Sequence, residues 1–298
     1  MKMLIVTTSS DMRDLCRRMK GTIGFVPTMG ALHDGHLSLI RRARAECDAV
    51  VASVFVNPTQ FAPGEDYETY PRSLDEDCVK LEAAGADLVF APSAEEMYPS
   101  GSASFVDVGE IANRLDGASR PGHFRGVTTI VTKLFHLVGP DCAYLGQKDA
   151  AQIAVLRAMI RDLKFPIELV VCPIVREPDG LAMSSRNLRL APDERRRALV
   201  LHGALQAACE LLASGETRSD VLRAAMLNRF ARVPSVRLDY AEVIDPDSLL
   251  PVRDTGEGAL IAVAAWVGSI RLIDNVLTEH LLIEHPSLHS RLLESVHA

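Results

Sequence analysis

The chain has 298 residues, of which 48% are hydrophobic and 24% are charged, as in an ordinary globular protein with a sizeable core. Its formal net charge of −7 argues against a general nucleic-acid binder, which would carry a basic face. No apolar run approaches the ~20 residues of a membrane span, and the chain opens with no credible signal peptide. The six cysteines form no CxxC pair. We therefore expect a cytoplasmic protein with reduced thiols and no membrane partner.

The stretch Phe25 to His36 (FVPTMGALHDGH) joins an expected strand at Ile23–Val26 to an expected helix. Helix N-termini present unpaired backbone N–H groups and the positive end of the helix dipole, and phosphates bind there. His33 and His36 are three residues apart and can face the same side. The stretch therefore indicates a nucleotide-phosphate site of the HxGH kind. A plain turn with a capping histidine fits it equally well when it is considered alone.

Strand and helix signals alternate up to about residue 172. The expected strands are 23–26, 49–56, 87–91, 104–108, 142–145 and 167–172, and the expected helices follow residue 36, run from 73 to about 85, and cover 126–138 and 149–163. Such alternation implies right-handed crossovers and a parallel sheet with helices on both faces. The first half of the chain is therefore predicted to be an α/β domain over residues 1–175.

The pattern changes after about residue 176. Helices are expected at 192–212 and 218–230, and strands at 236–244, 259–267 and 269–273. Gly268 between the last two strands suits a tight turn, so these strands should be antiparallel. Residues 176–298 are therefore predicted to form a smaller C-terminal α+β domain.

Polar motifs follow three of the expected parallel strands, at His33/His36, Asn57/Gln60 and Gly146–Asp149. Ligands of parallel sheets bind beyond the carboxyl ends of the strands, so these motifs should meet at one edge. Lys148 at such a turn can reach a phosphate as a point charge. The alternative is a capping-box start to the next helix with a solvated lysine.

Three further clusters could bind ligands. The hydroxyls and guanidinium of Ser184, Ser185 and Arg186 suit a triphosphate whose charge grows on a leaving pyrophosphate, although a Ser-rich linker is equally compatible. The basic stretch 120–125 could hold an anion or simply begin a helix. The acidic run 75–77 could hold Mg²⁺ through water, but we favour stabilisation of a helix dipole, because Mg²⁺ usually binds to substrate phosphates. The P-loop and GxGxxG patterns are both missing from the sequence.

In this order, the motifs closely resemble those of the pantothenate synthetase (pantoate–β-alanine ligase) family. The resemblance spans roughly residues 3 to 277, and its motifs are PTMGALHDGH at 27–36, FVNPTQF at 55–61, YPR at 70–72, RPGHFRGV at 120–127, GQKD at 146–149, MSSRN at 183–187 and RLIDN at 271–275. Several long motifs in the correct order are far more specific than any single one. The tail after Leu277 outruns the usual end of the family, and we assign no chemistry to it.

The resemblance implies a Rossmann-like ligase of the HIGH/KMSKS nucleotidyltransferase superfamily. Pantoate would attack the α-phosphate of ATP, and β-alanine would then attack the pantoyl adenylate to give pantothenate and AMP. The implied ATP-binding residues are Met29, Gly30, Ala31, Leu32, His33, Asp34, Gly35, His36, Gly146, Gln147, Lys148, Asp149, Val175, Met183, Ser184, Ser185 and Arg186. The implied catalytic residues among them are His36, His33, Lys148 and Arg186.

Two glutamines complete the site that the resemblance implies. Gln60 and Gln152 would bind pantoate, and Gln60 would also bind β-alanine. ATP would be a substrate and Mg²⁺ a cofactor; family counterparts of Glu76 and Asp77 lie near a metal, but its direct ligands are unknown. The family is commonly a homodimer. Because an acyl adenylate must be kept from water, we also predict a closing lid at Phe61–Tyr70.

Two other functions remain open at this point. Another nucleotidyltransferase of the superfamily would leave the amides of Asn57, Gln60 and Gln152 unexplained, because a phosphorylated acceptor favours arginines. A non-catalytic nucleotide-binding regulator on the same fold would be expected to have lost the histidines, Lys148 or Arg186, yet all are present.

Overall fold

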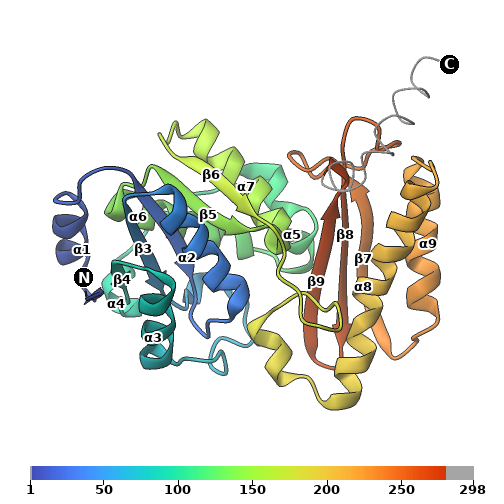
Figure 1. The fold of residues 1–298 in the computed structure, drawn as a ribbon, viewed down its shortest axis with the longest axis horizontal. Coiled ribbons are helices and arrows are strands. Elements are labelled where there is room, and N and C mark those ends of the chain that lie inside the picture. Colours follow the sequence, from blue (N-terminus) through green and yellow to red (C-terminus); the bar gives the residue numbers. More distant parts are fainter. Residues whose placement is uncertain (1, 280–298) are drawn as a thin grey trace. The chain divides into compact units, whose positions relative to one another are not determined.

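The computed structural model describes residues 2–279, so nearly all of the tail after Leu277 lies outside the described residues. The chain forms two compact units (Figure 1). The first unit contains the residues up to Gln147 together with Ala151–Val175. The second contains the short segment Lys148–Ala150 and the residues from Arg176 onward.

The first unit is built on a six-stranded sheet with the order β1-β4-β3-β2-β5-β6, in which every pairing is parallel. Its strands are β1 (Leu4–Val6), β2 (Ile23–Thr28), β3 (Ala49–Val54), β4 (Leu88–Phe90), β5 (Cys142–Gly146) and β6 (Glu168–Cys172). The central strands are nearly continuous apolar runs because both of their faces are covered. The prediction of a parallel α/β sheet is confirmed.

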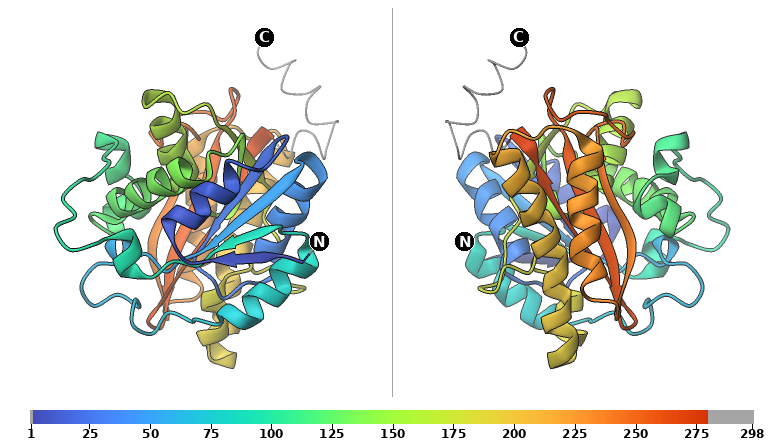
Figure 2. Two further views of the ribbon diagram at one scale, coloured as in Figure 1. Left: turned by 90° about the vertical axis from the view of Figure 1, so that its left-hand side faces the viewer. Right: turned by 90° about the vertical axis from the view of Figure 1, so that its right-hand side faces the viewer.

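Helices cover both faces of this sheet (Figure 2). The helices of this region are α1 (Ser9–Cys16), α2 (Asp34–Glu46), α3 (Leu74–Ala84), α4 (Ala94–Met97), α5 (Asp116–Ser119), α6 (His123–Val138) and α7 (Ala150–Asp162), with 3₁₀ turns η1 (Pro58–Gln60), η2 (Gly109–Asn113) and η3 (Gln147–Asp149). Neighbouring β2 residues face opposite ways. Val26 packs in a core cluster with Ile40 of α2 and Leu81 of α3, whereas the Phe25 ring meets Phe135 of α6 at 6.4 Å.

The strand expected at 104–108 is wrong, because this segment is irregular. Its backbone groups bond to a helix instead of a neighbouring strand. The Val106 N–H donates to Thr129 Oγ1 at 3.0 Å, and the Val106 carbonyl accepts from Thr128 Oγ1 at 2.6 Å. Both threonines belong to α6, so two helix hydroxyls satisfy the backbone that a sheet would otherwise have to pair.

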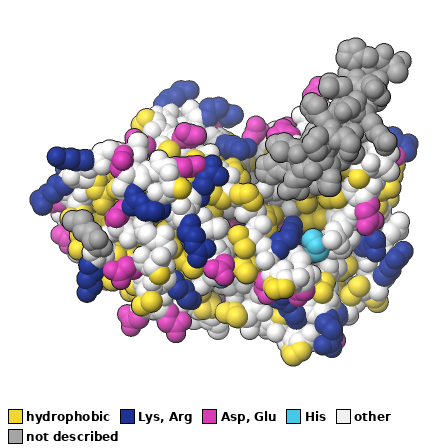
Figure 3. All heavy atoms as spheres, in the orientation of Figure 1, with side chains coloured by type: hydrophobic (Ala, Val, Ile, Leu, Met, Phe, Trp, Pro, Cys, Tyr) yellow, Lys and Arg dark blue, Asp and Glu magenta, His cyan; other side chains and the backbone are white. Residues whose placement is uncertain are grey.

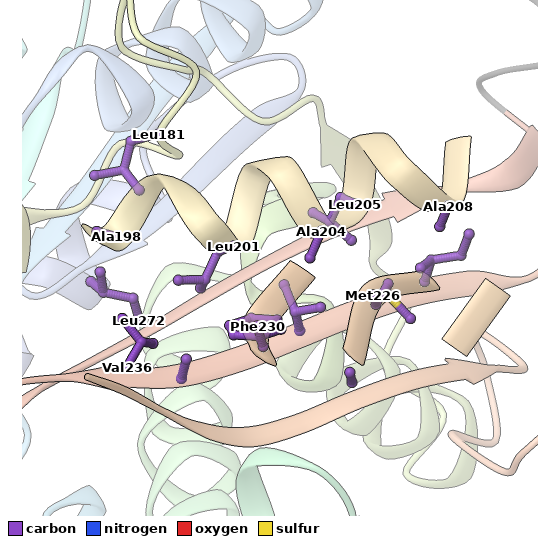
Figure 4. Close-up of a cluster of buried hydrophobic side chains, with 14 of the residues drawn as sticks. Leu181, Ala198, Leu201, Ala204, Leu205, Ala208, Met226, Phe230, Val236 and Leu272 are labelled. Carbon is purple, nitrogen blue, oxygen red and sulfur yellow. The ribbon is translucent and has the colours of Figure 1, made fainter. Parts of the chain in front are cut away.

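The second unit is a three-stranded antiparallel sheet, β7-β8-β9, packed against two helices (Figure 1). Its elements are η4 (Ser185–Arg189), α8 (Pro192–Ala213), α9 (Ser219–Ala231), β7 (Val236–Ile244), β8 (Leu260–Val267) and β9 (Ile270–Leu277). Leu201 and Leu205 of α8 and Phe230 of α9 pack over the sheet (Figure 4). Gly268 turns between β8 and β9 with φ 59°, so the predicted antiparallel pair is confirmed.

Within residues 2–279, no helix combines the length and the apolar character that a membrane span requires. On the face drawn in Figure 3, basic and acidic side chains are interspersed. All six cysteines are free thiols, and burial raises the pKa of Cys16 and Cys209 to about 11. Such thiols are poor nucleophiles, so their role is packing.

Candidate active site

The Met29–His36 segment leaves β2 by a sharp turn and enters α2. Gly30 and Ala31 both have positive φ values, 85° and 52°, and a left-handed conformation is unusual for a residue with a Cβ. His33 is the N-cap of α2, and its backbone N–H donates to Nδ1 of His36 at 3.4 Å. The two imidazole rings face each other at a tilt of 37°, with centroids 4.0 Å apart. The turn therefore presents two imidazoles together at a helix N-terminus, where an anion is favoured.

The amide pair Asn57 and Gln60 lies beside this turn. Gln60 is buried, its Nε2 lies 3.0 Å from Met29 Sδ, and its Oε1 accepts from Asn57 Nδ2 at 3.2 Å. Asn57 Nδ2 also donates to the Gly126 carbonyl of α6 at 3.1 Å. A Cβ on Gly126 would lie 2.3 Å from the Thr59 carbonyl oxygen, so only glycine lets this loop approach the helix. The structure thus brings Gln60 to the Met29 turn.

Tyr98 and Lys133 support the amide pair from behind. The Tyr98 hydroxyl donates to Asn57 Oδ1 at 2.9 Å, and Lys133 Nζ lies 4.0 Å from the centre of the Tyr98 ring. Lys133 Nζ also donates to the Met97 carbonyl. Burial lowers the pKa of Lys133 and raises that of Tyr98. Lys133 stands out in the sequence only as one of several basic residues, and its contact with Tyr98 could not be read there because it joins segments far apart in the chain.

The predicted lid segment, 61–70, is tied to Arg120, the C-cap of α5 just before α6. Glu65 receives two hydrogen bonds from Arg120, at 2.8 and 2.7 Å. The Gln60 carbonyl accepts from Arg120 at 3.3 Å and lies 2.8 Å from His123 Nδ1. Because a carbonyl can only accept, His123 carries its proton on Nδ1, and Nε2 can accept from Arg120 at 3.0 Å. We call Glu65, Arg120 and His123 the latch. Whether the segment closes over substrate stays a prediction.

The latch should open in acid. Burial raises the pKa of Glu65, but the hydrogen bonds and charge of Arg120 outweigh it, so the pKa lies below its ordinary value of 4.5. A lowered pKa means that the carboxylate stabilises the latched state above pH 4.5 and loses this effect as the pH falls through the folded-state pKa. As the pH falls below 4.5 and the latch opens, we expect pepsin to cut the segment at Tyr67 increasingly fast. Glu65→Gln should expose Tyr67 to chymotrypsin already at pH 7, with Glu68→Gln as the control; equal cutting of both variants would contradict the latch.

In the second unit, Lys148 is held by the terminal strand. The Lys148 carbonyl accepts from Asn275 Nδ2 of β9 at 3.0 Å, and Lys148 Nζ pairs with Asp149 Oδ1 at 3.0 Å. The side chain of Lys148 is 22% exposed and that of Asp149 is 47% exposed, so the ammonium is screened but still accessible. β9 thus places the backbone of the expected catalytic lysine.

Removing this anchor should impair the lysine without unfolding the chain. We expect Asn275→Ala to weaken folding by about 1 kcal/mol, the usual net effect of one hydrogen bond. The rate of adenylate formation should fall about tenfold, since a misplaced catalytic group loses much of its effect. Pyrophosphate exchange and thermal unfolding measure the two quantities. Asn228→Ala on the exposed side of α9 is the matched control, and an unchanged exchange rate in Asn275→Ala would contradict the anchoring role.

The Met183–Arg186 loop belongs to the same unit as Lys148. Ser185 is buried, and the Arg186 N–H donates to Ser184 Oγ at 3.3 Å, which begins η4. The segment before the loop is fixed by Arg176, which forms two hydrogen bonds with Asp274 of β9, at 2.7 and 3.0 Å, and one with the Gly180 carbonyl. Asp274 and Asn275 are adjacent in β9, so one strand supports both the segment before the serine-arginine loop and Lys148.

The remaining predicted residues lie at ends of elements. Gly146 ends β5, Gln147 is buried in η3, and Gln152 is half-buried in the first turn of α7. Val175 is the last residue of the first unit. The strands β3, β2 and β5 are neighbours, so the segments that follow them leave the same edge of the sheet, as predicted.

Two kinds of contributor escaped the sequence analysis. Asp77 was part of an acidic run, yet its carboxylate is buried against the Met29–His36 turn. Asp274 and Asn275 were matched as a family motif without a role. Both kinds carried a signal in the sequence, the acidic run for Asp77 and the RLIDN motif for the pair, but neither signal gave the backbone group that each side chain binds.

Comparison with known proteins decides the family. The family model described as pantoate-beta-alanine ligase matches residues 4–277. The chain belongs to the pantoate–β-alanine ligase family. It is 60% identical over 266 residues to a pantothenate synthetase from Acidobacterium capsulatum, covering 87% of this chain and 89% of that protein. This family membership confirms the resemblance that the motifs carried.

Two solved structures of the pantoate–β-alanine ligase family extend the likeness to the fold. The pantothenate synthetase of Thermus thermophilus is 49% identical, with a TM-score of 0.89 over 92% of this chain and 99% of that one. The ligase of Francisella tularensis, solved in complex with beta-gamma ATP and beta-alanine, is 34% identical, with a TM-score of 0.77 over 93% of this chain and 98% of that one. The predicted fold class is confirmed by these neighbours.

Proposed function

We propose that the chain condenses pantoate with β-alanine, using ATP, in two steps. A pantoate carboxylate oxygen attacks the α-phosphorus, and the bond to the bridging oxygen of pyrophosphate breaks. The amine of β-alanine then attacks the acyl carbon of pantoyl adenylate, AMP leaves, and the nitrogen loses a proton. Family membership carries this proposal, and the Francisella ligase supports it because its structure holds an ATP compound and β-alanine.

The residues suit adenylation because this reaction needs alignment and charge stabilisation, with no protein nucleophile. We assign His33, His36, Lys148 and Arg186 to the phosphates, where negative charge grows as pyrophosphate leaves. Gln60 and Gln152 can hydrogen-bond the hydroxyls and carboxylate of pantoate, and Gln60 can also meet β-alanine. The buried amide pair beside Met29 is the feature that favours a hydroxy acid without a phosphate group over a phosphorylated acceptor.

Mg²⁺ enters this proposal only as a companion of ATP. Among residues 2–279 there is no group of three or more His, Cys, Asp or Glu side chains that could hold a metal ion. Both oxygens of Asp77 accept backbone N–H groups, so this member of the acidic run 75–77 does not fit a metal site. The cation is expected to bind to the phosphates of the nucleotide. A cytoplasmic location and a homodimer, the usual state of the family, complete the proposal.

One assay tests the function. The chain is incubated with ATP, pantoate and β-alanine, and the products are identified. AMP together with pantothenate is expected, and exchange of pyrophosphate into ATP should need pantoate but not β-alanine. A product that retains the nucleotide would indicate another transferase of the superfamily, and no turnover with tight ATP binding would indicate a regulator.

A further inference from the structure

The Met29–His36 turn contains a conformation that its own sequence does not favour. Ala31 has φ 52°, in the left-handed region that favours glycine, directly after Gly30 with φ 85°. In a tight turn, successive backbone N–H groups can point to the same side and form an anion-binding concavity, and here the N–H groups of Ala31 and Leu32 do so. Such a turn persists only when its surroundings hold it.

Asp77 on α3 occupies that concavity from the protein side. Its Oδ2 accepts the Ala31 N–H and its Oδ1 accepts the Leu32 N–H, both at 2.8 Å. The side chain is fully buried. A Cβ on Gly30 would lie 3.0 Å from Asp77 Oδ2, so the turn packs directly against the carboxylate.

Lys80, three residues later on α3, holds the same turn through a backbone carbonyl group. Its Nζ donates to the Leu32 carbonyl at 2.9 Å. Residues three apart on a helix lie on one face. Asp77 and Lys80 together therefore fix the N–H of Ala31 and both the N–H and the C=O of Leu32, immediately before His33.

We propose that Asp77 and Lys80 are positioning residues for the phosphate turn, and that Asp77 is not a metal ligand. This inference rests on the proposed binding of ATP by Met29–His36. Both oxygens of the Asp77 carboxylate face backbone N–H groups. The positive ends of these N–H groups would repel a cation that approached the carboxylate from that side. By fixing Ala31 and Leu32, the pair sets where His33 and His36 stand before ATP arrives, and such preorganisation is what a charge-stabilising site requires.

Asp77→Asn tests the proposal, because an amide can accept only one of the two N–H groups and places its own N–H₂ against the other. Hydrogen exchange of the peptide covering 29–36, measured without ligands, should become about tenfold faster, as local opening does when a holding contact is lost. Pyrophosphate exchange should fall about tenfold, the loss expected from displaced catalytic groups. Transfer of the pantoyl group from supplied pantoyl adenylate to β-alanine should change far less. Asp75→Asn, an exposed carboxylate in the same helix turn, is the matched control.

A magnesium titration separates the positioning role from metal binding. The Mg²⁺ concentration for half-maximal pyrophosphate exchange should be the same in Asp77→Asn and the wild type. A shift of that concentration, or rescue by excess Mg²⁺, would overturn the proposal, and so would unchanged hydrogen exchange.

Lys80→Met is the second variant. If Asp77→Asn does not fold, faster hydrogen exchange at 29–36 in Lys80→Met supports the proposal, and an unchanged hydrogen-exchange rate overturns it. Lack of all activity in the wild type would instead reject the proposed function, while hydrogen exchange would still test the contact.

Discussion

Replacing Lys148 by alanine is expected to lower the kcat of adenylate formation by about 10²- to 10³-fold, the usual effect of removing one donor from a charge-stabilising site. The ammonium meets its greatest partner charge when pyrophosphate leaves, so the transition state should lose more than the ground state. The KM for ATP should therefore change much less than kcat. Pyrophosphate exchange at saturating and limiting ATP measures both constants.

The matched control for Lys148→Ala is Lys20→Ala, which removes one exposed positive charge from the chain outside the candidate site. It should leave the exchange rate unchanged. An exchange rate of Lys148→Ala within about threefold of the wild type would show that the lysine contributes no transition-state stabilisation. Thermal unfolding of both variants should be similar, because the Lys148 side chain pairs with the half-exposed Asp149 and such pairs contribute little to stability.

The largest effect on stability is expected from Arg176→Met. Asp274 is 1% exposed, and Arg176 forms two hydrogen bonds with it, so the substitution leaves a buried carboxylate without its counter-ion. Breaking one partner of a buried pair typically costs about 3–5 kcal/mol. The Asn275 N–H still donates to Asp274 Oδ1, so we expect the lower end of that range. Urea unfolding gives the change in free energy.

Two further variants decide whether the loss comes from the orphaned charge. Arg176→Met combined with Asp274→Asn should recover much of the stability, because the buried group is then neutral. Arg196→Met, in a pair whose side chains are 71% and 64% exposed, should change the free energy of unfolding by less than about 0.5 kcal/mol. Equal losses in Arg176→Met and Arg196→Met would contradict the account.

The sequence predicted the bounds of helices and strands best where the residues of a single element form a recognisable hydrophobic or capping pattern. β7 has the predicted bounds Val236–Ile244, and α3 ends before Gly85 because that residue is left-handed at the C-cap. β1 and α1 were missed: a three-residue edge strand with Leu4 and Ile5 half exposed shows no periodicity that separates it from a loop.

In the candidate site, too, some residues could be predicted from local sequence patterns and others could not. The residues proposed to meet ligands lie in long motifs at ends of strands, so Gln60 and Lys148 could be named from the sequence. Residues that hold them act across large sequence separations. Asp77 bonds to Ala31, and Asn275 bonds to Lys148, and no local pattern encodes either pairing. Only the packed fold reveals which acidic or amide side chain takes which backbone group.

Gly126 has a consequence for how this enzyme could acquire a different substrate. The missing side chain in the first turn of α6 lets the Asn57–Gln60 loop rest on the helix backbone. Any larger residue there would push the loop, and with it the Gln60 amide, away from Met29. With Gln60 in its proposed role, we expect acceptor choice to be sensitive to a position that offers a ligand no functional group. A search for altered specificity should vary Gly126 and its loop together, since either change alone leaves the two surfaces mismatched.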